Sequence, residues 1–279
     1  MSRTRLYQAS LENVDLDSEI KRLYHQANLS PEKEARALKG FGLRDGMSVL
    51  EVASGPGFVT EWLSKLVPNG SITCVEIDPA LISHAEGYLK GKAGSPYRII
   101  EGSVMNLDFP DNTFDFAFVR LLYEHLEDSV AATKEIMRTL KPGAKLVVAE
   151  GDNAFNNITD PYFREVQPIR DKLVQLQFAQ GGNVMIGRSL YRILTTAGLE
   201  DVDLEAIASH SGDKGLEWFY PQFNPDRLMP AVKEGVITEA EYELFRSTVE
   251  KFLASKDSFY LRILLMACGQ KPSRAGSES

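Results

Sequence analysis

The feature that most constrains the fold of this chain is a buried strand that runs into a glycine turn and then a helix. It covers residues 49–60, with the sequence VLEVASGPGFVT. Glycines on both sides of Pro56 let the backbone bend tightly and approach a ligand where a Cβ would clash. A second strand-like run, residues 73–78 (TCVEID), ends in acidic residues one helix later. Together these segments predict a nucleotide-binding βαβ unit.

The charges around this turn indicate which ligand fits. Glu76 follows Gly57 by 19 residues, the spacing at which a carboxylate accepts hydrogen bonds from ribose hydroxyls. Glu51 ends the first strand, where a negative charge would repel a pyrophosphate at the helix N-terminus and attract an amino group. Thr60 occupies the third glycine position of the dinucleotide fingerprint. The predicted ligand is therefore a nucleoside without phosphates and with a positive end, and S-adenosylmethionine (SAM) meets this description.

Six segments resemble, in order, motifs of the class I SAM-dependent methyltransferases. Residues 51–57 and 75–78 resemble the first and second motifs, and 101–109 the adenine-binding segment. Residues 114–120, 124–128 and 140–144 resemble the fourth strand and the helix and turn that follow it in the small-molecule branch, which includes the methyltransferase type 11 and ubiquinone–menaquinone biosynthesis-like members. The resemblance covers roughly residues 45 to 150. It is weak over 1–40 and 155–260, where substrate choice would reside.

The resemblance implies a set of cofactor-binding residues at the ends of the strands and in the first helices. They are Tyr24, Gln26, Glu51, Ala53, Ser54, Gly55, Gly57, Glu76, Ile77, Ser103, Val104, Arg120 and Leu121. Ser103 stands where the family usually has an aspartate or asparagine, and a serine can still accept a hydrogen bond from the adenine amino group. Ala53 occupies the family's first glycine position, where alanine is tolerated if φ is negative.

Composition bounds the class of protein. The chain has 279 residues and 43% hydrophobic content, which is enough for a full core in one or two domains. It contains no run of 18 apolar residues to span a membrane and no apolar signal core at its N-terminus. Cys74 and Cys268 lie in apolar runs and are expected to be buried thiols in a reducing compartment. We therefore expect a cytoplasmic protein.

A net charge of −8 without a basic block disfavours DNA or RNA as a partner. The four histidines show no His/Cys/Asp cluster with metal-ligand spacing, so no metal is expected. A small-molecule substrate remains the expected partner, and the sequence leaves a homodimer open.

Strands and helices alternate from residue 47 to residue 150, which predicts a parallel sheet with helices on both faces. The expected fold is a Rossmann-like three-layer α/β/α sandwich with a seven-stranded, mostly parallel sheet, N-terminal helices and a helical lid. Strands are expected at 47–52, 72–76, 97–101, 114–119, 144–150, 199–207 and 259–268, and helices at 58–66, 79–90, 127–140 and within 12–40 and 156–198. Ser30 is expected to cap a helix that has Pro31 at its first position.

Five segments follow from this pattern. They are an N-terminal helical cap (1–45), the SAM-binding core (46–155), a core completion (156–209), a lid insertion (210–257), and a last strand with a disordered tail (258–279). The lid is dense in aromatic residues, which favours contact with an apolar or aromatic substrate.

Methyl transfer is an in-line displacement that depends on positioning, and a general base helps only if the acceptor arrives protonated. Candidate catalytic residues are His125, Glu150 and His210. His125 has a near-neutral reference pKa but also suits a packed wall residue. Glu150 would orient an amine or hydroxyl, or else belong to a solvated turn. Arg120, in an apolar run, needs an anionic or carbonyl partner. It is either the methionine carboxylate of SAM or an acid in the pocket wall, or else Glu51 or Glu150 in a structural salt bridge.

The function that the sequence predicts is SAM-dependent methylation of a small, largely apolar metabolite at O, N or C, in secondary-metabolite or quinone-like biosynthesis. One alternative is an enzyme on the same scaffold that transfers no methyl group, such as a cyclase or decarboxylase. A second is a non-catalytic SAM-binding partner protein. The mass of the product distinguishes methyl transfer, which adds one methyl group, from the first alternative, which adds none.

Overall fold

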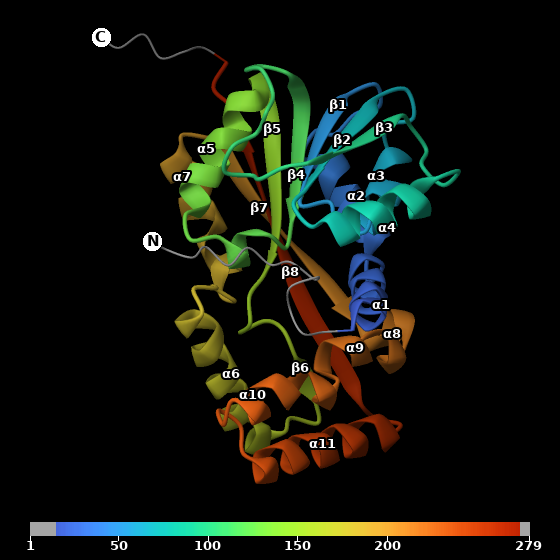
Figure 1. Ribbon diagram of the computed structural model, residues 1–279, viewed down its shortest axis with the longest axis vertical. Helices are drawn as coiled ribbons and strands as arrows, with labels where there is room; N and C mark the ends of the chain where they lie inside the picture. The colour runs from blue at the N-terminus through green and yellow to red at the C-terminus, as the bar shows by residue number, and fades with distance from the viewer. Residues whose placement is uncertain (1–14, 274–279) are drawn as a thin grey trace.

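The computed structural model describes residues 15–273, which form a mixed sheet of eight strands with helices on both faces (Figure 1). The strands are β1 (Ser48–Val52), β2 (Ser71–Glu76), β3 (Tyr97–Glu101), β4 (Phe114–Arg120), β5 (Leu140–Gly151), β6 (Ile158–Asp160), β7 (Glu200–His210) and β8 (Phe259–Gln270). The α-helices are α1 (Leu16–Ala27), α2 (Pro31–Gly40), α3 (Phe58–Ser64), α4 (Pro79–Leu89), α5 (Ser129–Thr139), α6 (Gln167–Ala179), α7 (Leu190–Ala197), α8 (Ser211–Lys214), α9 (Tyr220–Phe223), α10 (Met229–Lys233) and α11 (Glu239–Ala254).

The sheet has the order β3-β2-β1-β4-β5-β8-β6, and β7 pairs with β8 as well. Strands β1 to β5 run parallel, and β8 is antiparallel to β5, β6 and β7. Nearly continuous apolar runs in β1, β2 and β4 suit parallel strands that are covered on both faces. The α/β sandwich predicted from the sequence is therefore confirmed.

Two hydrophobic clusters flank the sheet. On one face, α5 and α7 pack on side chains such as Leu50 and Val119. On the other face, α1, α2 and α3 pack on Val49, Phe116 and Met266. Alternate residues of each strand therefore enter different clusters, as a two-sided sheet requires.

A third cluster lies beyond the sheet and surrounds the far end of β8, where α6, α9, α10 and α11 gather (Figure 1). Phe219, Phe223, Phe245 and Phe252 of the predicted lid segment are buried there against Tyr260 of β8. Helix α11 begins with a capping box between Thr238 and Glu241, which fixes its start.

Two details differ from the expectations. Residues 158–160, expected within helices, form β6 because they pair with the extended end of β8. Ser30 and Pro31 begin α2 as expected, but the Ser30 hydroxyl hydrogen-bonds Ser209 Oγ on β7 at 2.5 Å and does not cap the helix. The predicted disordered tail falls largely on residues 274–279, outside the described residues.

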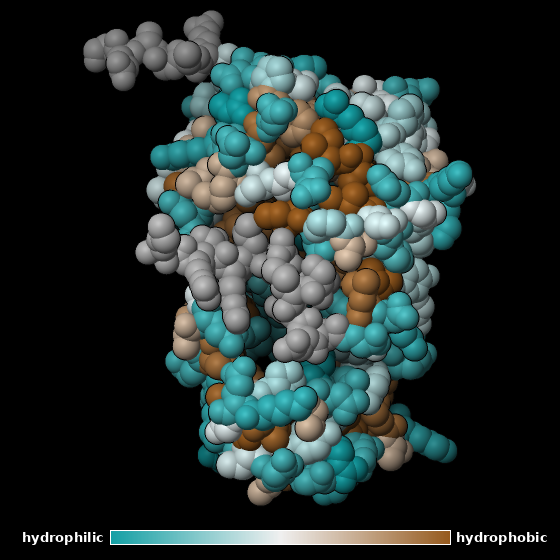
Figure 2. Space-filling model, in the orientation of Figure 1, coloured by the Kyte–Doolittle hydropathy of each residue, from teal (hydrophilic) through white to brown (hydrophobic). Residues whose placement is uncertain are grey.

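None of the helices in residues 15–273 is long and apolar enough to cross a membrane. The face shown in Figure 2 is largely hydrophilic, with hydrophobic residues gathered in separate patches.

Candidate active site

A cavity of about 600 Å³ lies at the carboxyl ends of the parallel strands. Open α/β sheets bind ligands there, at the point where the strand order reverses. Because β1 lies between β2 and β4, this point falls beside the glycine turn. The strand-end half of the cavity is lined by Glu51–Pro56, Glu76, Ile77, Ser103, Val104, Arg120 and Leu121. The helical half is lined by Asn153, Asn156, Asn157, Arg170, Leu173, Val174, Leu176, Gln222, Phe223, Leu228, Tyr260 and Arg262.

The two glycines of the turn after β1 have different surroundings. A Cβ on Gly55, whose φ is +57°, would meet no protein atom within 4 Å, and Gly55 lines the cavity. A Cβ on Gly57, whose φ is +87°, would lie 3.0 Å from Leu89 Cγ and 3.2 Å from Ala85 Cβ. Gly57 does not line the cavity. Glycine is therefore needed at position 57 for the packing of α3 on α4, whereas Gly55 leaves room for a ligand.

Three non-glycine residues of the cavity wall have left-handed backbones: Ala53, Leu121 and Asn157, whose φ is +63°. Ala53 follows β1 with φ +56°, and Leu121 follows the neighbouring β4 with φ +55°. The condition expected to make alanine tolerable at position 53, a negative φ, is therefore not met. An L-residue in this region costs about 1–2 kcal/mol, and such residues gather at ligand sites.

Glu76 holds the turn through its carboxylate. Its Oε2 accepts a hydrogen bond from Gly55 N at 2.8 Å, and its Oε1 accepts from Ile77 N at 2.8 Å and Asp78 N at 3.0 Å. Burial nevertheless raises the pKa of Glu76. The carboxylate lines the cavity, and Oε2, which has a single donor, retains a lone pair for a further one.

Glu51 brings a second buried carboxyl group to the wall of the strand-end half. Its side chain accepts a hydrogen bond from Thr60 Oγ1 at 2.7 Å and a weak one from Cys74 Sγ at 3.7 Å. Burial is the main cause that raises the pKa of Glu51 to about 7, and the neighbouring Glu76 raises it further. A cation beside Glu51 would favour its ionised form.

Arg120 has a different partner from those expected. Its guanidinium forms a two-pronged ion pair with Glu34 of α2, with Nε–Oε2 at 2.8 Å and Nη2–Oε1 at 3.0 Å, and donates to Gln26 O. The expected ion pair with Glu51 or Glu150 is therefore wrong: α2 supplies the carboxylate. Arg120 and Gln26 both line the cavity, so this ion pair fixes the N-terminal helices over the strand-end half.

Tyr24, the other residue expected to contact the cofactor from α1, does not line the cavity. Its ring packs edge-on against Phe58, with the centroids 5.2 Å apart, and lies 6.3 Å from the ring of Trp218. Tyr24 therefore joins α1 to α3 and to the lid segment.

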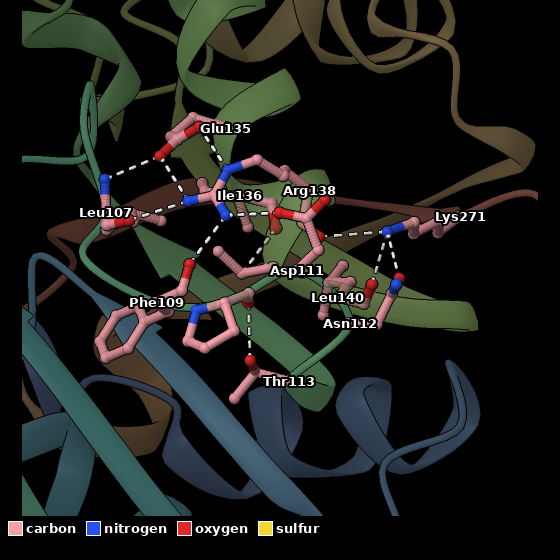
Figure 3. Close-up of polar contacts among 12 residues, drawn as sticks. Leu107, Phe109, Asp111, Asn112, Thr113, Glu135, Ile136, Arg138, Leu140 and Lys271 are labelled. Atoms are coloured by element: carbon pink, nitrogen blue, oxygen red, sulfur yellow. Dashed lines mark hydrogen bonds and ion pairs between the residues drawn. The ribbon is translucent and has the colours of Figure 1, made fainter.

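The loop after β3 is anchored by Arg138 of α5 (Figure 3). Its guanidinium donates to Leu107 O at 2.8 Å and to Phe109 O at 2.7 Å, and it pairs with Glu135 and Asp111. Glu135 Oε1 in turn accepts from Leu107 N at 2.8 Å. Ser103 and Val104, which line the cavity, belong to the start of this loop.

Among the three candidate catalytic residues, His125 alone lines the cavity. It ends the short 3-10 helix η1 (Tyr123–His125), and its Nε2 lies 3.5 Å from Glu124 Oε1. Glu150 is fully buried behind η1, where its Oε1 accepts from Leu122 N and Tyr123 N. Burial raises the pKa of Glu150 well above its ordinary value, and Glu124 adds to the effect.

His210 ends β7 and pairs with Asp213 of α8 at 3.2 Å. It does not line the cavity. The structure thus brings His125 together with the residues of the glycine turn, and places His210 elsewhere.

The polar residues of the helical half, above all Arg170, Tyr260 and Arg262, were not predicted from the sequence. One signal was available for Arg262, because it interrupts the apolar run of residues 259–268. The same signal marked Arg120. No comparable signal marks Arg170, since an arginine on a helix is ordinarily solvated.

In comparisons with known proteins, residues 50–148 match the methyltransferase domain family. Demethylmenaquinone methyltransferase of Staphylococcus aureus (strain JH9) is 32% identical over 143 residues, which are 50% of this chain and 58% of that protein. The chain therefore matches little more than half the length of these curated relatives.

Three solved structures share the fold. A SAM-dependent methyltransferase from Aquifex aeolicus is 23% identical, with a TM-score of 0.52, over 71% of this chain and 94% of that one. Phosphoethanolamine N-methyltransferase 2 of Haemonchus contortus, in complex with phosphomonomethylethanolamine and S-adenosylhomocysteine, is 16% identical, with a TM-score of 0.54, over 86% and 52%. The [4+2]-cyclase SpnF is 20% identical, with a TM-score of 0.55, over 86% and 82%.

Residues 50–148 are therefore similar to the methyltransferase domain family, and the chain shares the fold of the SAM-dependent methyltransferases. The resemblance drawn from the sequence motifs is confirmed.

Proposed function

We propose that this protein binds SAM in the strand-end half of the cavity and transfers its methyl group to a small molecule in the helical half. The observation that carries the proposal is the continuity of the cavity. One space of about 600 Å³ joins the glycine turn and Glu76 to a chamber between α6, α9, α10 and β8. A cofactor and an acceptor can therefore meet without crossing solvent, as a displacement at carbon requires.

The residues of the strand-end half fit SAM in charge and shape. Glu76 would accept hydrogen bonds from the ribose hydroxyls, and the walls at Ile77, Ser103 and Val104 would hold the adenine. Glu51 is a buried carboxyl group that accepts hydrogen bonds from a hydroxyl and a thiol, and it would bind the amino group of the methionine moiety. When bound, SAM supplies an electrophilic methyl group on a sulfonium.

The remaining residues would act by positioning. Glu150 is a positioning residue, because it fixes the backbone of Leu122 and Tyr123 and so places His125 at the cavity wall. His125 would remove a proton from an acceptor that arrives protonated. We assign no part in the site to His210, since its imidazole pairs with Asp213 away from the cavity.

The acceptor would be a small, largely apolar molecule that is methylated at O, N or C. Leu173, Val174, Leu176, Phe223 and Leu228 supply apolar walls to the helical half, which favours an acceptor with an apolar body. Segment 210–257 would act as a lid, because Phe223 and Leu228 reach the cavity from it.

The test is incubation of the purified protein with SAM labelled at the methyl group and a small-molecule extract. We expect labelled products heavier by one methyl group and release of an equal amount of S-adenosylhomocysteine. A product without the label and without release of S-adenosylhomocysteine would contradict methyl transfer. It would favour a reaction such as cyclisation, the activity in the name of SpnF, whose fold this chain shares.

A further inference from the structure

Arg262 occupies a core position of β8. The side chains of Tyr260, Arg262, Leu264 and Met266 alternate along the strand and face the same side, and all four are buried. Leu264 and Met266 belong to the cluster beside the sheet, and Tyr260 to the cluster around the far end of β8. Arg262 is only 8% exposed and lies between the two clusters, where its guanidinium faces the cavity.

Arg262 has no ion-pair partner among residues 15–273, since no carboxylate oxygen lies within 4.0 Å of its nitrogens. No side-chain hydrogen bond of Arg262 is formed within the same residues either. Glu124 and Glu34 act on it only from longer range, and Arg120 opposes them. Burial lowers the pKa of Arg262. A buried cation with these surroundings is costly unless a ligand provides the counter-charge.

A second arginine reaches the same part of the cavity. Arg170 of α6 lines the helical half and donates one hydrogen bond, to Asn157 O at 3.3 Å. It too lacks a carboxylate within 4.0 Å in the described part of the chain. The Tyr260 hydroxyl donates to Asn157 Oδ1 at 2.7 Å. Tyr260 and Arg262 are two residues apart on one strand face, about 7 Å, and Arg170 shares the partner Asn157 with Tyr260, so both arginines reach the cavity beside Tyr260.

We propose that the acceptor carries an anionic oxygen group, such as a carboxylate, which Arg262 and Arg170 bind in the helical half. This inference rests on the proposed function and names the class of its acceptor: an apolar body with an acidic group. Two guanidinium groups supply several donors in fixed directions, which suits a planar acid group. The apolar walls of the helical half would hold the rest of the molecule.

The carboxylate of SAM is a second source of the same chemistry, but the topology disfavours it. Glu51 lies near the end of β1 and the glycine turn follows it, whereas Arg262 lies on β8, and β4 and β5 separate these two strands. Three strand spacings correspond to about 14 Å. An anion at Arg262 would therefore lie far from an amino group at Glu51, although both belong to one amino-acid moiety in SAM.

The test uses sodium benzoate and its neutral counterpart benzamide, with the full chain saturated by S-adenosylhomocysteine and ionic strength balanced by sodium chloride. We expect benzoate to raise the Tm by about 2–4 °C more than benzamide does. Arg262→Gln should abolish this difference and weaken benzoate binding about tenfold or more, the loss expected for charge-assisted hydrogen bonds. Arg246→Gln, a change on the exposed face of α11, should keep the difference.

Three results would overturn the inference. Equal shifts with benzoate and benzamide would show that the chamber does not select an acid. Competition between benzoate and S-adenosylhomocysteine, together with weaker S-adenosylhomocysteine binding by Arg262→Gln, would assign the arginine to the cofactor. A fall in the Tm of the free Arg262→Gln protein would make Arg262 a structural group, because removal of an unpaired buried cation should leave the Tm unchanged or raise it.

If the proposed function is wrong, the experiment gives a different result. In that case the wild-type protein would not bind S-adenosylhomocysteine, while the preference for benzoate in its absence would still report on the arginines.

Discussion

Glu51 places a buried carboxyl group at the wall of the cavity, with a hydroxyl and a thiol as hydrogen-bond donors. Its pKa of about 7 lies well above the ordinary value of 4.5, mainly because of burial. The group is therefore partly protonated at neutral pH when no cation is bound. Binding of an ammonium group would shift it toward the ionised form.

This pKa leads to a pH-dependent stability. Between about pH 4.5 and about pH 7 the folded protein holds a proton on Glu51 that the unfolded chain has released, so the free energy of unfolding falls as the pH rises through this window. The difference amounts to about 3 kcal/mol. Urea denaturation across this pH window should show that the free energy of unfolding of Glu51→Gln does not fall by this amount. A variant as pH-dependent as the wild type would contradict the pKa shift.

The left-handed backbone of Ala53 strains the turn after β1. Ala53→Gly removes about 1–2 kcal/mol of left-handed strain and adds about 0.5–1 kcal/mol of backbone entropy, so its stability should equal or slightly exceed that of the wild type. Ala53→Val should be less stable than the wild type by more than about 1 kcal/mol. Ala117→Gly, in the interior of β4, is the matched control and should lose about 1 kcal/mol. Thermal denaturation measures all three, and a loss in Ala53→Gly as large as in Ala117→Gly would rule out strain at Ala53.

Single arginines and acids connect secondary-structure elements around the cavity. Arg120 joins β4 to α2 through Glu34, and Arg138 joins α5 to the loop after β3. Glu150, at the end of β5, fixes η1. These contacts place the walls of the cavity without adding apolar area.

Arg138→Ala should loosen the loop that carries Ser103 and Val104. Because Arg138 is one-third exposed, we expect a loss of only about 1 kcal/mol in the free energy of unfolding. Affinity for S-adenosylhomocysteine should fall several-fold in calorimetry, since ordering the loop becomes part of binding. Arg138→Lys should behave similarly, because a lysine cannot bridge both carbonyls. Arg246→Ala, which removes a surface arginine that pairs with two carboxylates, is the control, and an equal loss of affinity in it would refute the role of the loop.

Two substitutions of Glu150 separate the role of its hydrogen bonds from that of its charge. Burial raises its pKa, so the folded state favours the protonated form and the free energy of unfolding falls as the pH rises above the ordinary value. Glu150→Gln should keep the hydrogen bonds and be at least as stable as the wild type at neutral pH. Glu150→Ala should lose about 1–3 kcal/mol, because two buried N–H groups lose their acceptor. Chemical denaturation of both variants tests this, and equal losses would contradict it.

The sequence predicted local elements well and long-range contacts poorly. The alternation of strands and helices from 47 to 150 follows from hydrophobic periodicity and glycine turns, and it was predicted closely. Long-range partners were not predictable: Glu34 lies 86 residues before Arg120, and no local pattern links them. Residues 158–160 form a strand only because the end of β8 lies beside them.

At the scale of the whole molecule, β8 belongs to both parts that line the cavity, the sheet and the helical cluster beyond it. Its part from Leu264 to Gln270 pairs with β5, and β7 pairs along almost its whole length. Its other end, residues 259–261, extends past β5, pairs with β6 and enters the cluster of α6, α9, α10 and α11 (Figure 1). The sequence predicted this strand and the aromatic lid as separate features. Their packing around one chamber could not be predicted from the sequence, because nonlocal contacts decide which face of a strand is covered.

The central claim is that the strand-end half of this cavity is a SAM site. Calorimetric titration with S-adenosylhomocysteine tests it most directly, with Gly55→Ala as the variant and Gly91→Ala as its control. Both glycines have a positive φ and open space where a Cβ would lie, but only Gly55 lines this cavity. We predict binding by the wild type that weakens about tenfold or more in Gly55→Ala, where the Cβ blocks close approach of the ligand, and stays nearly unchanged in Gly91→Ala. No binding by the wild type, or equal affinities in both variants, would contradict the account.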